Sequence, residues 1–182
     1  MTMPSGKPST KEQFEPVYAH QAMIVAYCRR RGSRDPEGLA AEAMAIAWRR
    51  VEALDVDHCL PWLINTARNL LYEEYRSQQR SQPMDPESFA AVDSRHEPEF
   101  EIESLDPEID RALASLCPDD REALLLVAWE DLTPSGAAES LGIRPATFRV
   151  RLHRARRRFK KALDAAPVKT VSPSNHPLEE KA

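Results

Sequence analysis

The sequence predicts an all-α protein of two small helical domains, the second a helix-turn-helix, joined by a flexible acidic linker. Three observations lead to this fold class. Apolar residues recur at three- and four-residue spacings through two long stretches, as they do on the buried face of a helix. An acidic, proline-containing segment separates the two stretches. With five glycines and 7% aromatic residues, the composition does not suggest an all-β protein.

The first domain is predicted over residues 12–80, after a polar tail at 1–11 that has too few apolar side chains to become ordered. Helical periodicity begins at Phe14 and draws one apolar stripe as far as Cys28. Asp35 before a proline is a typical helix start, because Asp accepts a bond from the first turn and proline there needs no acceptor. Asp57 is a candidate cap for the helix after that. The three helices are expected over residues 14–31, 36–54 and 58–79.

The segment at 81–108 is acidic, contains several prolines and has few large apolar residues, so it is predicted to be a flexible linker. The two domains should therefore tumble independently in the free protein. The second domain is predicted at 109–165, before a disordered tail at 166–182. Its helices are expected to begin near 109, 118, 134 and 145, and the last to run through Ala165. Gly142 makes a tight turn between the final two, which gives a helix-turn-helix.

The formal net charge of −4 argues, taken alone, against a nucleic-acid partner, because phosphate binding needs positive charge. The distribution along the chain reverses that interpretation. Residues 144–161 contain seven arginines and two lysines without any acidic residue. In contrast, almost every charged residue of 85–110 is acidic. The pattern indicates a strongly polarised molecule with a basic surface on the second domain.

The final helix has the pattern of a DNA recognition helix. At 100° per residue, Phe148, Leu152, Ala155 and Phe159 form one narrow stripe that faces inward. Base edges are read from the first turns of such a helix, while later cations bind phosphates. The alternative interpretation is a solvated cationic face on an ordinary helix. The residues predicted to contact DNA are Pro145, Ala146, Arg149, Val150, Arg151, His153, Arg154 and Arg157.

The helix at 58–79 is expected to bury one apolar stripe and to turn an aromatic and polar face outward. Aromatic rings stack on unpaired bases, amides bond base edges and cations hold the backbone, so such a face suits single-stranded DNA. The alternative, in which Trp62 and Tyr72 pack against the first or second helix, stays open. The outward residues are Trp62, Asn65, Asn69, Tyr72 and Arg76.

The sequence gives little support to other kinds of site. His58 and Cys59 are adjacent, which is not the spacing of a tetrahedral metal site, so neither a metal nor a cofactor is expected. No nucleophile elbow, glycine-rich phosphate loop or HExxH helix occurs, so no enzymatic activity is expected. No apolar run approaches the roughly 18 residues that span a bilayer, and the N-terminus has no hydrophobic signal core. The protein is therefore expected in the cytoplasm without membrane insertion, with its three cysteines reduced.

Several stretches resemble the extracytoplasmic-function (ECF) group of RNA polymerase sigma factors. Those similar to region 4 of that group are LCPDDREALLL (116–126), DLTPSGAAESLGI (131–143) and TFRVRLHRAR (147–156). Those similar to region 2 are DPEGLAAEA (35–43), AW (47–48) and PWLINTARNL (61–70). Together they extend over most of the two predicted domains.

The resemblance implies an alternative sigma factor that binds core RNA polymerase at its clamp and flap and starts transcription from promoter DNA. The second domain would read the minus-thirty-five element, and the first would melt the minus-ten element. The resemblance puts Asn69, Tyr72 and Arg76 at an unstacked base of the non-template strand, and Trp62 beside the melted junction. An anti-sigma factor is a candidate partner. The implied polymerase contacts are Leu39, Glu42 and Trp48.

The chain departs from the group's pattern at two places. Ala40 and Ala41 stand where acidic and amide residues are frequent in the polymerase-binding helix, which leaves Glu42 as its main charge. Pro134 and Gly136 replace an aromatic residue and a glutamate that are common in the first helix of the helix-turn-helix. Neither change breaks the fold, since proline is favourable in a first helical turn.

Two alternative functions stay open. An autonomous helix-turn-helix transcriptional regulator would bind an operator without joining the polymerase. Such regulators usually carry a ligand-binding or phosphoacceptor domain, and nothing between Phe14 and Arg80 resembles one. A helical adaptor, the other alternative, would use its basic helix to bind an acidic protein.

Overall fold

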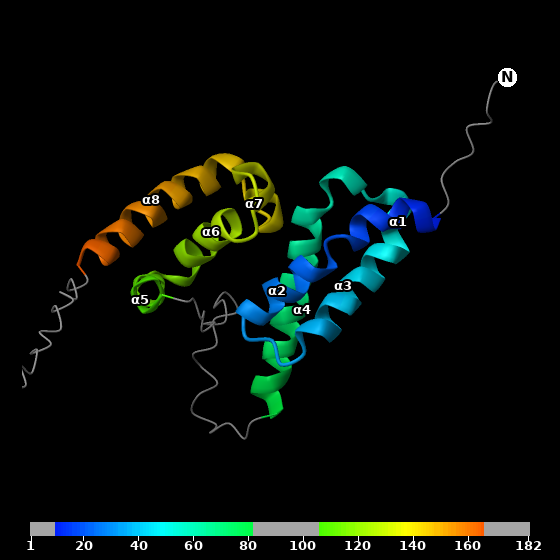
Figure 1. The fold of residues 1–182 in the computed structure, drawn as a ribbon, viewed down its shortest axis with the longest axis horizontal. Coiled ribbons are helices and arrows are strands. Elements are labelled where there is room, and N and C mark those ends of the chain that lie inside the picture. The colour runs from blue at the N-terminus through cyan, green and yellow to red at the C-terminus, as the bar shows by residue number, and fades with distance from the viewer. Residues whose placement is uncertain (1–9, 82–105, 166–182) are drawn as a thin grey trace, which may run out of the picture.

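A computed structural model describes residues 10–81 and 106–165 of the chain, so the predicted C-terminal tail, most of the predicted N-terminal tail and most of the predicted linker lie outside it. Thr10 and Lys11, which were predicted to belong to the disordered tail, lie instead in a helix. The described residues form helices and turns, as predicted (Figure 1). The first group is α1 (Thr10–Tyr18), α2 (Gln21–Arg30), α3 (Pro36–Arg50), the 3-10 turns η1 (Val51–Ala53) and η2 (Val56–His58), and α4 (Leu60–Ser81). The second group is α5 (Pro107–Ala114), α6 (Pro118–Ala128), α7 (Pro134–Ser140) and α8 (Pro145–Asp164).

Helix starts and stops follow the predicted local chemistry. Asp35 caps α3, with its Oδ1 accepting from the Gly38 amide at 2.8 Å. Thr133 caps α7 in the same way, with its Oγ1 accepting from the Gly136 amide at 3.1 Å. Gly142 has a φ of +64°, in the left-handed region that glycine adopts without strain, and this ends α7 and redirects the chain into α8.

The start of the first domain differs from the prediction. The single helix expected before Gly32 is divided at Ala19 and His20 into α1 and α2. The His20 amide bonds to the Val17 carbonyl at 3.1 Å across the break, and both helices turn apolar side chains into one core. Periodicity alone therefore could not reveal the break. Asp57, a predicted cap, lies instead in η2, before α4 begins.

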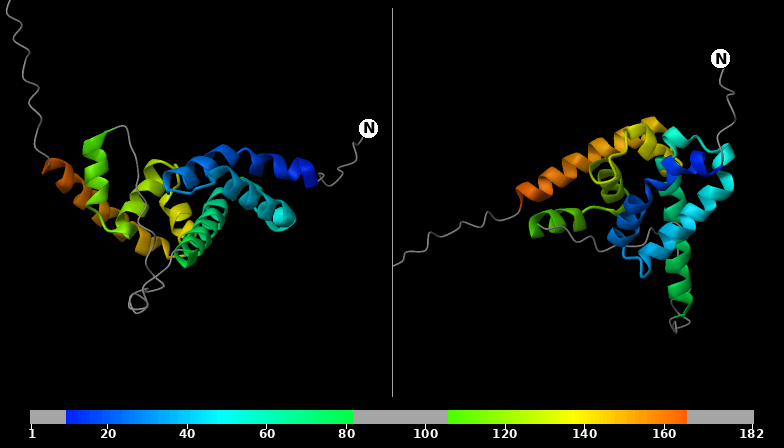
Figure 2. Two further views of the ribbon diagram at one scale, coloured as in Figure 1. Left: turned by 90° about the horizontal axis from the view of Figure 1, so that it is seen from below. Right: turned by 45° about the vertical axis from the view of Figure 1, so that its right-hand side comes forward.

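Helices α2, α3 and α4 pack against one another, and α1 lies across η1 and η2 (Figures 1 and 2). Small side chains on α3 allow this close approach, since Ala40, Ala43 and Ala47 are fully buried. Leu63 and Ile64 fill the core from α4. Burying such apolar surface is the main stabilising contribution in a small helical domain.

In the second group, α8 lies along α6, α7 and α5. The buried Arg121 of α6 closes the end of α5, because its guanidinium donates to the carbonyls of Leu113 at 2.9 Å and Ala114 at 3.1 Å. The last carbonyls of a helix have no amide four residues on to bond, and Arg121 adds to the bond that the Leu113 carbonyl accepts from the Leu116 amide at 3.1 Å. A small second core beneath α8 joins Leu116 and Leu125 to Leu113.

The two groups are not separate bodies in this structure. Helix α7 packs against α4, and one apolar core runs from Ile24 of α2 and Ile64 of α4 to Leu126 of α6. The prediction of domains that tumble independently is therefore not what the structure shows. The reason is physical: these contacts join residues far apart in the sequence, from 62 positions for Ile64 and Leu126 to 102 for Ile24 and Leu126, and helical periodicity carries no information on such pairs.

Candidate nucleic-acid interface

The two faces of α8 divide as the sequence predicted. Phe148 and Ala155 are fully buried and Leu152 nearly so, which fixes the helix against the domain core. Phe159 is partly buried in the second core. The opposite face is exposed, and its predicted DNA contacts are Pro145, Ala146, Arg149, Val150, His153, Arg154 and Arg157.

Two arginines of α8 point back to the start of α6. The Arg151 guanidinium lies 3.0 Å from the Asp119 carboxylate, and Arg158 donates to the buried carboxylate of Asp120. Both acids also lie in the first turn of α6, where the helix dipole favours negative charge. Arg151 was predicted to contact DNA, yet its half-buried side chain is bound to Asp119. The Asp119–Asp120 pair was a signal for such anchoring that the prediction did not use.

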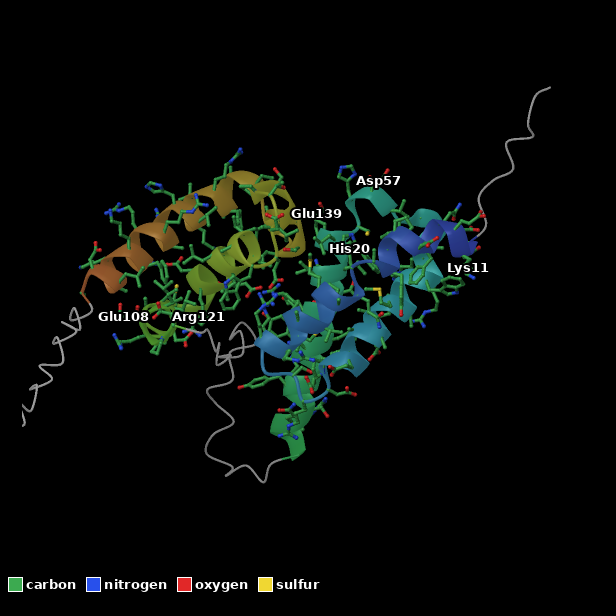
Figure 3. The ribbon with its side chains drawn as sticks, viewed as in Figure 1. Lys11, His20, Asp57, Glu108, Arg121 and Glu139 are labelled. Atoms are coloured by element: carbon green, nitrogen blue, oxygen red, sulfur yellow. The ribbon has the colours of Figure 1, made fainter. Side chains whose placement is uncertain are left out.

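The outer face of α8 is a strongly basic ridge. Figure 3 shows nitrogen-tipped side chains extending from α8 on the side away from α6. Arg149, Arg154 and Arg157 are exposed on that side. Val150 lies among them with 52% of its surface exposed. Cations flanking an exposed methyl-bearing side chain form a surface suited to phosphates and to the thymine methyl group.

The outward face of α4 is less open than predicted. Asn69 and Arg76 are exposed, whereas Asn65 and Tyr72 are half-buried. The Asn69 amide nitrogen donates to the Asn65 oxygen at 3.0 Å, so the two amides form a pair one turn apart. The Arg68 guanidinium lies over the Tyr72 ring at 5.0 Å. The four predicted residues, Asn65, Asn69, Tyr72 and Arg76, lie on one side of α4.

Trp62 does not lie fully exposed on the outward face of α4. It is half-buried and lies against the apolar core that both domains share. Its backbone carbonyl accepts a bond from the Thr66 hydroxyl at 2.9 Å, inside the first turns of α4. The ring is therefore partly covered in this arrangement, unlike Asn69 further along the same helix.

The predicted polymerase contacts lie on α3. Glu42 is exposed, and Leu39 is half-buried against the core. Trp48 is 44% exposed and its ring meets Phe14 of α1 edge to face, with centroids 5.0 Å apart. Ala40 is fully buried, so the packing of α3 accounts for a small residue there.

His58 and Cys59, which are adjacent in the sequence, differ in their exposure. His58 is exposed with its Nδ1 at 3.3 Å from the Asp55 carboxylate, whereas the adjacent Cys59 is buried. Burial raises the pKa of the Cys59 thiol, and raises that of Cys28 to about 12. Residues 10–81 and 106–165 hold no cluster of three or more metal-binding side chains, and none of their helices is long and apolar enough to cross a membrane.

Two family models match the two helical groups in order. The model of sigma-70 region 2 matches residues 17–81, and that of sigma-70 region 4 matches residues 107–159. Together they take in all of α2 to α4 and most of α5 to α8. The chain belongs to the sigma-70 family. Region 2 and region 4 are used below for these two parts of the chain.

Curated relatives come from the same family. The chain is 27% identical over 162 residues to the ECF RNA polymerase sigma factor SigE of Mycolicibacterium smegmatis, across 87% of this chain and 61% of that protein. It is 34% identical over 128 residues to the probable RNA polymerase sigma factor RfaY of Xanthomonas campestris pv. campestris, across 66% of this chain and 32% of that protein. The chain thus spans less than two thirds of the length of both.

Solved structures share the fold. The sigma factor RpoE of Bartonella quintana, solved with the anti-sigma factor NepR, superposes with a TM-score of 0.60 at 23% identity, over 85% of this chain and 98% of that one. CnrH, solved with the cytosolic domain of CnrY, gives a TM-score of 0.56 at 21% identity, over 86% and 90% of the two chains. At such identities the likeness concerns the fold.

Proposed function

We propose that this protein is an alternative sigma factor that binds core RNA polymerase, recognises the minus-thirty-five and minus-ten promoter elements and starts transcription. One observation carries the proposal: the exposed basic face of α8 belongs to a region 4 that is preceded in the same chain by a region 2. A helix-turn-helix alone supports only DNA binding. A region 2 in the same chain supports a function in complex with core RNA polymerase.

The proposed division of labour on α8 follows position. Arg149 and Val150 lie in the second turn, near the helix start, and read base edges with Ala146 and His153 beside them. Further along, Arg154 and Arg157 bind phosphates. Pro145 starts the helix. Arg151 supports the reading face through its bond to Asp119 at 3.0 Å.

The proposed minus-ten site lies on α4. Asn69, Tyr72 and Arg76 surround an unstacked base of the non-template strand, with Asn65 orienting the Asn69 amide at 3.0 Å. Trp62 acts beside the melted junction. Polymerase contacts are proposed on α3, at Leu39, Glu42 and Trp48, with the clamp as their partner, while region 4 contacts the flap.

The remaining properties follow from the same proposal. The protein acts by binding and not by catalysis, and it works in the cytoplasm, where the polymerase is. Its functional units are the two predicted domains, 12–80 and 109–165, which correspond to region 2 and region 4. An anti-sigma factor is proposed as a regulatory partner, because the sigma factor RpoE, which shares the fold, was co-crystallised with the anti-sigma factor NepR.

The first prediction tests this function in a purified system. Core polymerase with this protein should give run-off transcripts of defined start from a library of upstream DNA, and neither component alone should do so. Arg154→Ala combined with Arg157→Ala should reduce the yield, because region 4 then loses two phosphate contacts. A matched double variant at Lys11 and Arg111, which are exposed on α1 and α5, away from the proposed DNA and polymerase contacts, controls for the loss of positive charge.

The alternative function has a different signature in the same experiment. An autonomous regulator binds its operator tightly without polymerase and leaves the core enzyme unaffected. Tight, sequence-specific binding by the free protein, with no transcripts from any library member, would favour that alternative.

A further inference from the structure

The acidic start of α6 binds two arginines of α8. The Arg151 guanidinium lies 3.0 Å from the Asp119 carboxylate, and Nη1 of Arg158 donates to the Asp120 carboxylate, whose side chain is 6% exposed. Because Arg151 and Arg158 are seven residues apart, they share one side of α8, about 10 Å from each other along its axis. We call Asp119 and Asp120 the acidic pair. It holds α8 at two points, two turns apart.

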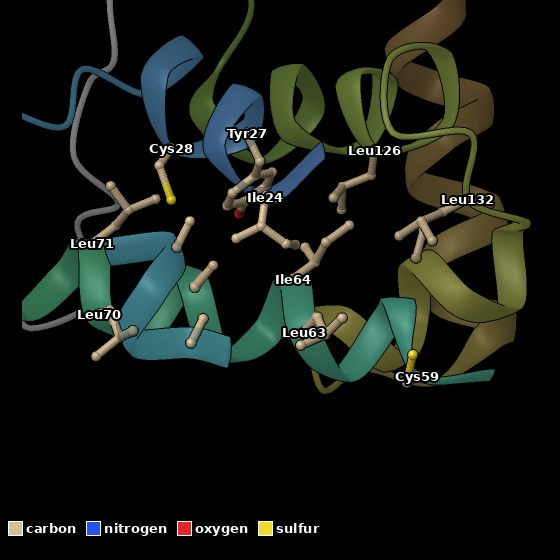
Figure 4. Packing of buried hydrophobic residues seen from close by; sticks show 14 of the residues in the cluster. Ile24, Tyr27, Cys28, Cys59, Leu63, Ile64, Leu70, Leu71, Leu126 and Leu132 are labelled. Atoms are coloured by element: carbon tan, nitrogen blue, oxygen red, sulfur yellow. The ribbon is translucent and has the colours of Figure 1, made fainter. Parts of the chain in front are cut away.

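The acidic pair has a fixed position within region 4. The residue that follows it, Arg121, is buried and donates to the Leu116 carbonyl at 3.3 Å, which binds the first turn of α6 to the chain leaving α5. At the other end of α6, Leu126 lies in the large apolar core, as Figure 4 shows. Since both ends of α6 are held, the acidic pair is a rigid support for α8.

The arginines of α8 divide between two flanks of the helix. At 100° per residue, Arg151, Arg154 and Arg158 follow one stripe on the side of α6. Arg149 and Arg156 lie on the opposite side. Among the residues that the structure describes, Arg149, Arg154 and Arg156 are exposed and form no ion pair. The acidic pair thus neutralises most of one flank, and the other flank keeps its charge.

A difference in charge between the flanks affects how a helix lies in DNA. The major groove of B-DNA is about 12 Å wide and is nearly filled by one helix, so the flanks of that helix face phosphates. Free cations on both flanks give phosphate contacts in many orientations and on any sequence. Free cations mainly on one flank favour one orientation, in which the neutral flank turns away from the DNA backbone. Such a helix presents the same residues to the bases each time.

We propose that the acidic pair holds Arg151 and Arg158 away from DNA phosphates and thereby raises the sequence specificity of region 4. The inference rests on the proposed function, in which α8 reads the minus-thirty-five element. Asp119 and Asp120 are therefore positioning residues, which act through α8 and do not touch the bases. The free flank supplies phosphate contacts, and Arg156 is one of them.

Electrostatics explains how two carboxylates keep these arginines from DNA. The side chains of Arg151 and Arg158 are 27% and 59% exposed, so both could reach a phosphate without any unfolding. An arginine that is already neutralised by a carboxylate replaces no counterion at the DNA, and counterion release supplies the sequence-independent part of binding. The nearby carboxylate also repels the phosphate. The arginines therefore support the position of α8 and add little non-specific affinity.

Neutralising the acidic pair should make DNA binding stronger and less specific. Asp119→Asn with Asp120→Asn keeps the side-chain size and frees both arginines. The complex of the full-length protein with core polymerase is bound to promoter DNA whose minus-thirty-five element is intact or scrambled, at several salt concentrations. On scrambled DNA the affinity should rise about tenfold and the salt slope should steepen by about two units. On intact DNA the affinity should change less than about threefold, because the favoured orientation turns the freed arginines away from the backbone.

A matched control removes the same charge elsewhere in region 4. Asp131 and Glu139 are exposed acids, and asparagine tolerates the φ of +50° at position 131. Asp131→Asn with Glu139→Gln should keep the wild-type slope and specificity. Two outcomes would overturn the proposal: an acidic-pair variant that behaves like this control, or one that loses affinity for intact and scrambled DNA in the same proportion, as a purely structural role requires.

Two further variants keep the test decisive if the double change disturbs folding. Asp119→Asn alone alters a carboxylate that is 51% exposed, and it should steepen the slope by about one unit with helix content unchanged by circular dichroism. Adding Arg151→Gln and Arg158→Gln to the acidic-pair variant should return slope and specificity to wild-type values. An unchanged slope in the single variant would contradict the inference while leaving the proposed function intact. A wild-type complex that does not distinguish intact from scrambled promoter would instead count against the proposed function.

Discussion

Helices α4 and α8 have the same design in the sequence but different surroundings in the fold. Each buries one apolar stripe and turns a face of polar and charged side chains the other way. On α8 that face is open along most of its length, because the helix lies at the edge of region 4. On α4 the start of the same face is partly covered, since α7 packs beside it.

The difference teaches that an amphipathic pattern defines what a helix buries within its own domain, and no more. Periodicity predicts the inward stripe from local spacing. A second partner can also bury residues on the remaining face, as region 4 does on α4. The pattern does not predict which residues these are. Trp62 is the example here, an aromatic residue off the main stripe that still lies against the shared core.

The largest effect is expected at Trp62. Trp62→Ala should lower the free energy of unfolding by about 2 kcal/mol, because a half-buried tryptophan loses part of the 3–5 kcal/mol that full burial gives. It should also impair promoter opening. Asn69→Ala, on the exposed part of the same helix, should change stability by less than ~0.5 kcal/mol while still impairing opening.

Urea unfolding and an open-complex assay on both variants separate the two contributions. Equal stability of the Trp62→Ala and Asn69→Ala proteins would mean that the tryptophan has no packing role, and would remove the contrast between the two helices.

Much of the fold was predictable from the sequence because its signals are local. Asp35, Thr133 and Gly142 mark helix ends by chemistry that acts over one turn, and the structure confirms each. The buried stripe of α8 is confirmed for the same reason. The predicted roles of the exposed residues stay predictions.

What the sequence did not predict involves long-range pairs. Arg31 looks like a surface residue at the end of a helix, and Glu122 like an exposed acid near the start of another, yet they bury each other across 91 positions. Arg151 resembles its neighbours Arg149 and Arg154, and only the position of α6 shows that it meets Asp119. Charge pairing between elements depends on the tertiary arrangement, which composition does not encode.

An effect on DNA binding, and not on stability, is expected on the open face of α8. If Arg149 reaches a guanine edge, Arg149→Ala should cost ~1–3 kcal/mol on the cognate minus-thirty-five sequence and relax discrimination at one base pair. Binding by the polymerase complex to a panel of single-base promoter changes checks this. A loss that is the same for every sequence would show that Arg149 does not read a base.

The smallest effects distinguish the two kinds of arginine on α8. Arg157 is exposed on the basic ridge, so Arg157→Ala should weaken all sequences alike and lower the salt dependence of binding by about one unit of slope. Arg151→Ala should leave that slope unchanged, because its guanidinium already faces Asp119 at 3.0 Å. Its expected cost is instead about 0.2–1 kcal/mol of stability, as for a partly exposed ion pair.

Titrating promoter binding by the polymerase complex at several salt concentrations measures both slopes, and thermal unfolding measures the stability of each variant. Asp119→Ala provides the matched control for Arg151, because it removes the same ion pair from the other side without removing a positive charge. If Arg151→Ala lowers the slope as much as Arg157→Ala does, then Arg151 leaves Asp119 to bind a phosphate when DNA is present. The open face of α8 would in that case include one more cation than the free protein displays, and the ion pair with α6 would be a resting position of that side chain.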